Sequence, residues 1–111
     1  MTFRRGDIVL VTFPYTDLST TKARPAVVVS DEIYHSAQPD VILASLTTNL
    51  NVRDSMDYLL QDWRESGLRF PTAFKPVVVT LQPTLIVYTI GKMTDRDMTE
   101  VSNRLRVSMA L

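Results

Sequence analysis

The sequence predicts a small, mainly β domain that is closed by one helix at its C-terminus. Short apolar runs rich in β-branched residues recur between positions 8 and 90, and turn-forming residues separate them. Positions 94–111 instead repeat apolar side chains at helical spacing. The 111 residues are enough for one core, and no repeat or linker divides them, so we expect a single domain over residues 1–111. Strands followed by one helix favour a small barrel with a helical lid.

Five or six short strands are expected. The first run ends at Pro14 and the second at Ser30-Asp31. Residues 62–71 contain glycine and proline and are expected to form a loop, Gln82-Pro83-Thr84 is expected to be a turn, and Gly91 to close the strand region. The predicted strands are Ile8 to Phe13, Ala26 to Val29, Val41 to Leu46, Tyr58 to Leu60, Phe74 to Leu81 and Leu85 to Ile90.

The last segment begins with Thr94-Asp95-Arg96-Asp97, which matches a capping box. An amphipathic helix of about 16 residues, about 24 Å long, should follow and pack on the sheet. Its methionines could instead form a seam with a partner, although core packing is their commoner use. The apolar positions at helical spacing are Met98, Val101, Leu105 and Met109, with Leu111 beyond them.

Composition narrows the class of function. The chain has no cysteine and one histidine, so a disulfide frame, a thiolate site and a multi-histidine metal cluster are not expected. Twelve basic and twelve acidic side chains cancel, which weakly opposes a general nucleic-acid binder but leaves room for a local groove. Since neither a membrane-length apolar stretch nor a signal segment is present, we expect a cytoplasmic protein without membrane contact.

Arg24 is the first candidate for chemistry. It follows a polar loop and precedes Pro25 and the apolar run of the second strand. Proline pushes the residue before it toward extended geometry, so Arg24 is held out of a helix. A guanidinium held this way suits a phosphate. The alternative is an ordinary solvated arginine at a strand edge.

Four segments in order resemble the MazF/PemK family of toxins. The resemblance covers about residues 4–111 and implies an SH3-like barrel with a C-terminal helix, a homodimer, and a metal-independent endoribonuclease that needs no cofactor. Such a toxin cleaves single-stranded RNA, including mRNA, and pairs with a cognate antitoxin whose disordered tail covers the RNA groove. The segments are Arg5-Gly6-Asp7-Ile8-Val9-Leu10-Val11, Arg24-Pro25-Ala26-Val27-Val28-Val29-Ser30, Val41 to Asn49, and Ser66-Gly67-Leu68 through Ile90-Gly91-Lys92-Met93.

The resemblance implies that Arg24 and Thr47 are the catalytic residues. Arg24 would supply two donors to the nonbridging phosphate oxygens, and Thr47 a hydroxyl that orients the phosphate. A threonine is a poor base, and the sequence assigns no residue to take the proton of the 2′-OH. The alternative for Thr47 is a strand-end hydroxyl that satisfies local backbone. Further RNA contacts are expected from Lys22, Thr48, Asn49, Arg53, Arg69 and Lys75. Each charged residue among them could instead be a solvated surface charge.

Two segments depart from the family pattern. The loop of residues 17–23 lacks the glycine and acidic residue of a Gly-Ser-Glu-Gln-like loop, and Val78-Val79-Thr80-Leu81-Gln82 stands where some relatives have an Ile-Arg-Thr-Leu-Asp-like segment. The missing charges leave a second function open. In that alternative, the chain is a catalytically weak or inactive SH3-like module that binds an antitoxin or another peptide.

Three further expectations concern single features. His35 could transfer protons near neutral pH, but a plain surface turn is favoured. Trp63 could stack a base, but packing in the core or an interface is favoured. The seam of the homodimer is expected to involve Ile8 to Phe13 and the terminal helix.

Overall fold

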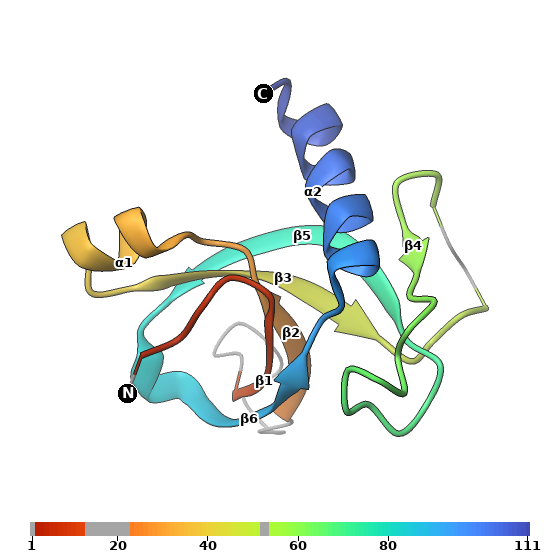
Figure 1. Ribbon diagram of the computed structural model, residues 1–111, viewed down its shortest axis with the longest axis horizontal. Helices are drawn as coiled ribbons and strands as arrows, with labels where there is room; N and C mark the ends of the chain where they lie inside the picture. Colours follow the sequence, from red (N-terminus) through yellow and green to blue (C-terminus); the bar gives the residue numbers. More distant parts are fainter. Residues whose placement is uncertain (1, 13–22, 52–53) are drawn as a thin grey trace.

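The computed structural model describes residues 2–12, 23–51 and 54–111. Six antiparallel strands form one sheet in the order β4-β5-β3-β2-β1-β6, and a long helix follows the last strand (Figure 1). The mainly β fold with a C-terminal helix is therefore confirmed. The elements are β1 (Asp7–Thr12), β2 (Ala23–Val28), α1 (Glu32–Ala37), β3 (Val41–Thr47), β4 (Tyr58–Leu59), β5 (Ala73–Leu81), the 3-10 helix η1 (Pro83–Leu85), β6 (Ile86–Lys92) and α2 (Asp95–Met109).

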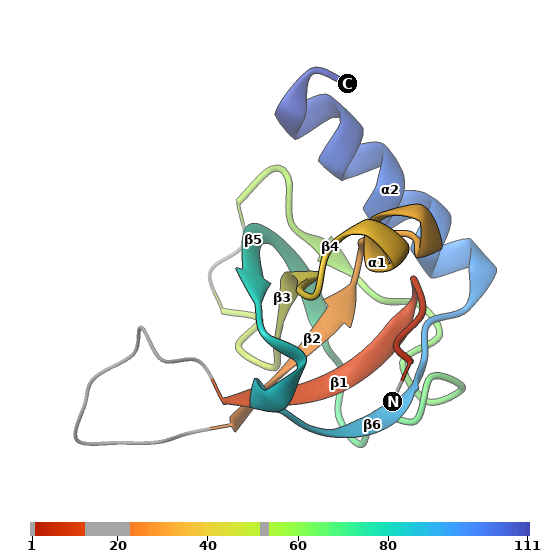
Figure 2. The same ribbon diagram turned by 90° about the vertical axis from the view of Figure 1, so that its left-hand side faces the viewer.

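The sheet is curled and buries apolar side chains on both faces (Figures 1 and 2). Successive residues of a strand point to opposite faces, so β1 sends Ile8 into one cluster and Val9 and Val11 into the other. The first cluster is covered by α2 through Val101 and Leu105. The second lies among β1, β2, β3 and the ends of β5 and β6.

This arrangement corrects the predicted dimer seam. β1 lies between β2 and β6, and Ile8, Val9 and Val11 are fully buried inside the chain itself. A continuous apolar run can mean burial on both faces of a sheet as well as an interface. The described part of the seam, residues 8–12, is therefore a central strand; Phe13 lies outside the described residues.

Helix α1 was not predicted, because its sequence was interpreted as a polar loop. It is one short helix with no buried residue, and its apolar Ile33 is 81% exposed, so it leaves no periodic apolar pattern. Asp31 takes extended geometry at the N-cap, and Glu32 places an acid in the first turn.

Several strand boundaries also differ from the prediction. β2 begins at Ala23, so Arg24 and Pro25 belong to the strand itself. Leu85 lies in the 3-10 turn before β6, where Pro83 favours the first position. β6 passes through Gly91 to Lys92 instead of ending at the glycine.

Helix α2 begins as predicted, with the Thr94 side chain accepting the N–H of Asp97 at 3.4 Å. Its C-terminal turns extend beyond the sheet, and Met109 and Leu111 are exposed instead of facing the core (Figure 1). The buried apolar stripe therefore ends at Leu105. Among the described residues, no helix is both long and apolar enough to cross a membrane.

Candidate active site

Strand register brings Arg24 and Thr47 toward each other. The paired part of β2 and β3 ends with Ala26 opposite Ser45, and extending this register by two residues would bring Arg24 opposite Thr47. Residues two apart on a strand share a face, so both side chains lie on the face of Ala26 and Ser45. Directly opposed residues have Cβ atoms about 4.5–5.5 Å apart. Arg24 is exposed and Thr47 is half-buried, so the pair is open to solvent at this end of the sheet.

Thr47 is fixed by the turn that follows it. Its Oγ1 accepts the N–H of Asn49 at 3.1 Å, and the Asn49 Oδ1 accepts the N–H of Asn51 at 3.2 Å. The hydroxyl thus satisfies local backbone, as the alternative interpretation expects. That bond uses an oxygen lone pair and leaves the hydroxyl proton to donate. Thr47 can therefore hold its position and still donate to a phosphate oxygen.

A groove of about 340 Å³ lies at this end of the sheet, on the opposite face from the Arg24 and Thr47 side chains. Pro25, next to Arg24, forms part of its wall, and so does Thr48, next to Thr47. Arg69, in the segment of residues 67–72, adds a positive charge to the groove lining. Thr48 and Arg69, both predicted RNA contacts, are thus brought together. The complete lining is Leu10, Pro25, Thr48, Gly67, Leu68, Arg69, Phe70, Thr72, Tyr88 and Ile90.

Two glycines allow residues 67–72, which form one wall of the groove, to pack closely against β6. Gly67 has a φ of +91°, which favours glycine, and a Cβ there would lie 2.9 Å from the Ile90 carbonyl oxygen. On the strand side, a Cβ at Gly91 would lie 2.0 Å from the carbonyl oxygen of Ser66. Backbone therefore packs directly on backbone at this point. The sequence placed Gly91 at the end of a strand but gave no sign of this contact.

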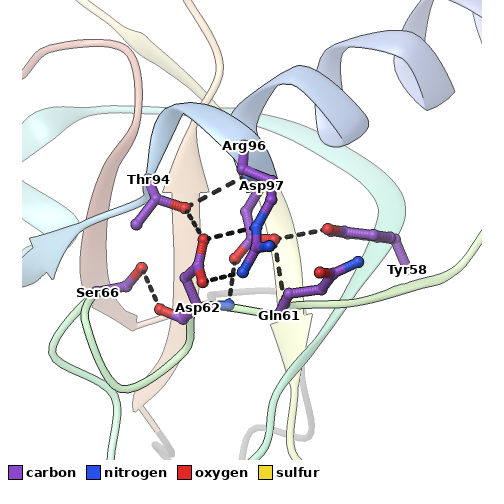
Figure 3. Close-up of polar contacts among 7 residues, drawn as sticks. All are labelled: Tyr58, Gln61, Asp62, Ser66, Thr94, Arg96 and Asp97. Atoms are coloured by element: carbon purple, nitrogen blue, oxygen red, sulfur yellow. Dashed lines mark hydrogen bonds and ion pairs between the residues drawn. The ribbon is translucent and has the colours of Figure 1, made fainter.

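Behind that wall, the buried Asp97 carboxylate joins α2 to the segment after β4 (Figure 3). It accepts the Tyr58 hydroxyl at 2.6 Å and the backbone N–H groups of Gln61 and Asp62 at 3.0 and 2.9 Å. Burial, with the hydrogen bond to Asp97 adding to it, raises the pKa of the Tyr58 hydroxyl well above its ordinary range, so Tyr58 stays protonated and donates. One helical carboxylate thus orders a whole irregular segment.

The side chain of Asp62 makes a second connection between this segment and the start of α2. Its carboxylate accepts from Thr94 Oγ1 at 2.7 Å and from two nitrogens of Arg96 (Figure 3). The hydrogen bonds from Arg96, and then from Thr94, hold the pKa of Asp62 below its ordinary value. Ser66 adds a bond from its hydroxyl to the Asp62 carbonyl at 3.0 Å. Residues 61–66 are therefore anchored just before the groove wall begins.

Of the other predicted RNA contacts, the two that the structure describes, Lys75 and Asn49, do not line the groove. Lys75 Nζ pairs with the buried Asp57 carboxylate at 2.8 Å, and this hydrogen bond raises the pKa of Lys75. Asn49 is exposed in the turn after Thr47. Lys22 and Arg53 lie outside the described residues, so their predicted contacts stay predictions.

His35 and Trp63 have packing roles. His35 lies on α1 with Nε2 2.5 Å from Ser30 Oγ, which also accepts the N–H of Ile42 at 3.0 Å, so the histidine anchors the short helix to β3 instead of sitting in a plain turn. Trp63 packs against the cluster under α2, which confirms the packing interpretation.

Sequence reasoning missed the two aromatic residues of the groove. Phe70 and Tyr88 are 64% and 53% exposed, although both are large apolar side chains. Tyr88 appeared only as a strand former among β-branched neighbours, and Phe70 as part of a loop. The only signal in the sequence was that Phe70 lies between Arg69 and Pro71, shortly after a glycine. This signal is weak by itself.

Comparisons with known proteins agree with this geometry. The model of the family described as PemK-like, MazF-like toxin of type II toxin-antitoxin system matches residues 4–109. Comparison with curated protein sequences gives no significant match. An endoribonuclease in complex with its cognate antitoxin from a Mycobacterial species superposes with a TM-score of 0.80, at 18% identity over 99% of this chain and 97% of that one. MazF from Deinococcus radiodurans gives a TM-score of 0.79, at 15% identity over 100% and 99% of the two chains.

Proposed function

Because the chain belongs to the family of PemK-like, MazF-like toxins of type II toxin-antitoxin systems, we propose that it is an endoribonuclease of single-stranded RNA. Arg24 and Thr47 act on the scissile phosphate, and the ribose 2′-OH is the nucleophile. The observation that supports the proposal is the antiparallel register of β2 with β3, whose extension by two residues would bring Arg24 opposite Thr47 at an open end of the sheet.

The reaction transfers the phosphoryl group within the RNA. The 2′-oxygen forms a bond to phosphorus and loses its proton, while the bond from phosphorus to the 5′-oxygen breaks and that oxygen gains a proton. Negative charge builds on the nonbridging oxygens of the phosphorane. The Arg24 guanidinium donates two aligned hydrogen bonds to these oxygens, and the Thr47 hydroxyl donates a third. The step needs no metal ion, because the nucleophile comes from the substrate.

The proposal includes the partners of such a toxin. A cognate antitoxin peptide blocks the RNA groove; a mycobacterial endoribonuclease of the same fold was solved in complex with its cognate antitoxin. A second copy of the chain completes a homodimer. The place of action is the cytoplasm, where mRNA is available.

The test is incubation of purified, EDTA-treated protein with a long RNA of defined sequence, followed by mapping of both new ends. We expect a 2′,3′-cyclic phosphate, opened in part to a 3′-phosphate, and a free 5′-OH. A deoxyribose at the scissile nucleotide alone should leave binding intact and stop cleavage. Ready cutting of that substrate, or complete dependence on added Mg²⁺, contradicts the mechanism.

Variants of Arg24 then test the site. Loss of one donor to a developing oxyanion typically lowers kcat about 100- to 1,000-fold. We expect at least this loss for Arg24→Ala, and poor recovery for Arg24→Lys, since lysine lacks the planar fork. An exposed side chain usually changes stability by less than about 0.5 kcal/mol, so the variant should unfold like the wild type. Cleavage at the wild-type rate would refute the assignment of Arg24.

A second candidate function is a binding module without catalysis. It is favoured by Val79 and Gln82, which stand where some relatives carry charge. The same assay separates the two functions. A chain that binds the RNA or an antitoxin peptide but leaves every phosphodiester intact is the module.

A further inference from the structure

We propose that Phe70 and Tyr88 form a slot that stacks one unpaired nucleobase of the RNA. The inference rests on the proposed function and names how that substrate is gripped. Both aromatic side chains line the groove of about 340 Å³, and both are more than half exposed. Aromatic faces left open to solvent in a groove are the usual platforms for single-stranded RNA.

The slot has two walls and an apolar floor. Tyr88 comes from β6, where it lies opposite Leu10 of β1, and Phe70 comes from the segment anchored by Gly67 against Ile90. Leu10, Leu68 and Ile90 contribute apolar surface between them. The floor is on strands and one wall on a backbone-packed turn, so the slot is formed before a ligand arrives.

Charge and position favour a nucleotide over other occupants. Arg69 lies in the groove, and no described residue of its lining is acidic. A phosphate next to a stacked base would thus meet a cation. The Thr48 hydroxyl, at the same groove, can donate to or accept from a base edge. The volume is at the lower end of small-ligand sites and fits a single nucleotide.

The experiment uses the full chain and a short RNA spanning its mapped cleavage site, made uncleavable by one deoxyribose at the scissile nucleotide. Affinity is measured by fluorescence anisotropy for Tyr88→Ala, Phe70→Ala, Tyr88→Phe and Phe70→Tyr. Removal of a stacking aromatic should weaken binding about 5- to 150-fold, while the two aromatic replacements keep it. Val87→Ala is the matched control, because Val87 is 55% exposed on the same strand but does not line the groove.

An abasic scan of the RNA identifies the stacked base. At one position, an abasic nucleotide should weaken wild-type binding by the same factor as Tyr88→Ala, and the two changes together should cost no more than either alone. Additive losses at every position, or wild-type affinity in both alanine variants, would overturn the slot.

The outcomes separate the slot from the proposed function. Absence of RNA cleavage and binding by the wild type removes both proposals. Normal cleavage and binding by the alanine variants removes the slot alone. If those variants bind RNA normally but lose self-association or an antitoxin peptide, the face is a protein contact and the slot is wrong.

Discussion

Replacement of Asp97 by asparagine tests the buried connection between α2 and the segment after β4. The substitution keeps the shape of the side chain but changes one of its two oxygens into an amide donor. With the remaining oxygen facing Tyr58 and Gln61, the amide would face the N–H of Asp62, which the carboxylate accepts at 2.9 Å. Two donors would then point at each other in a buried site.

The cost can be worked from these contacts. An unsatisfied buried N–H costs about 1–3 kcal/mol, and each of the two surviving bonds loses about 1 kcal/mol when its acceptor becomes neutral. The free energy of unfolding should therefore fall by about 3–5 kcal/mol, a large part of the about 5–15 kcal/mol typical of a domain.

Urea unfolding followed by circular dichroism measures this loss, and a double-mutant cycle with Tyr58→Phe isolates the bond from the tyrosine. Tyr58→Phe alone removes one donor and leaves the carboxylate two others, so its cost should be smaller, about 1–2 kcal/mol. An Asp97→Asn variant within 1 kcal/mol of the wild type, on the scale of those same contact energies, would refute the reasoning.

Three further predictions follow from other contacts. Gly91→Ala should lower both stability and RNA affinity, because its methyl group would enter the carbonyl of Ser66; unchanged anisotropy and urea midpoint would contradict the backbone contact. The pKa of Asp62 lies below its ordinary value of 3.8, so the stabilisation from Arg96 is present above that pH and is lost as the pH falls through the lower folded value. Arg96→Gln should therefore flatten the acid-side loss of stability in urea titrations at stepped pH, and an unchanged slope would speak against the pair. Sedimentation at micromolar concentration should give a dimer that Val107→Asp weakens and Ser108→Asp does not, since Val107 is an exposed apolar residue of α2; a monomer mass for the wild type would exclude it.

Periodicity in the sequence was enough to locate most elements, because buried faces leave a pattern. Strands β1, β3 and β5 and the start of α2 lie close to where alternation, apolar runs and the capping residue place them. Helix α1 buries nothing and therefore had no pattern to find. Met109 fits the helical spacing but is exposed, because α2 extends past the edge of the sheet. Helical spacing predicts which face of a helix is apolar, but it does not predict how far along the helix the sheet reaches.

The candidate site was predictable only in part. Arg24 and Thr47 come from family resemblance, and their mutual position depends on the register of β2 with β3, which no local pattern specifies. The groove required a contact between Gly91 and Ser66, which are 25 positions apart in the sequence. Phe70 and Tyr88, which are 18 positions apart, line the same groove only in the folded chain, so no local pattern could associate them.

The position of β1 has a consequence for synthesis on the ribosome. β1 pairs on one side with β6, and the N–H of Met93 donates to the carbonyl of Gly6 at 2.8 Å, so the first strand is completed by residues that are made much later. At about 5–20 residues per second, about 4–16 s pass between the two strands leaving the peptidyl-transferase centre. During that time one edge of β1 has no partner, and Tyr88 is not yet there to complete the groove. Until β6 has been made, a nascent chain therefore has neither a complete sheet nor a complete groove.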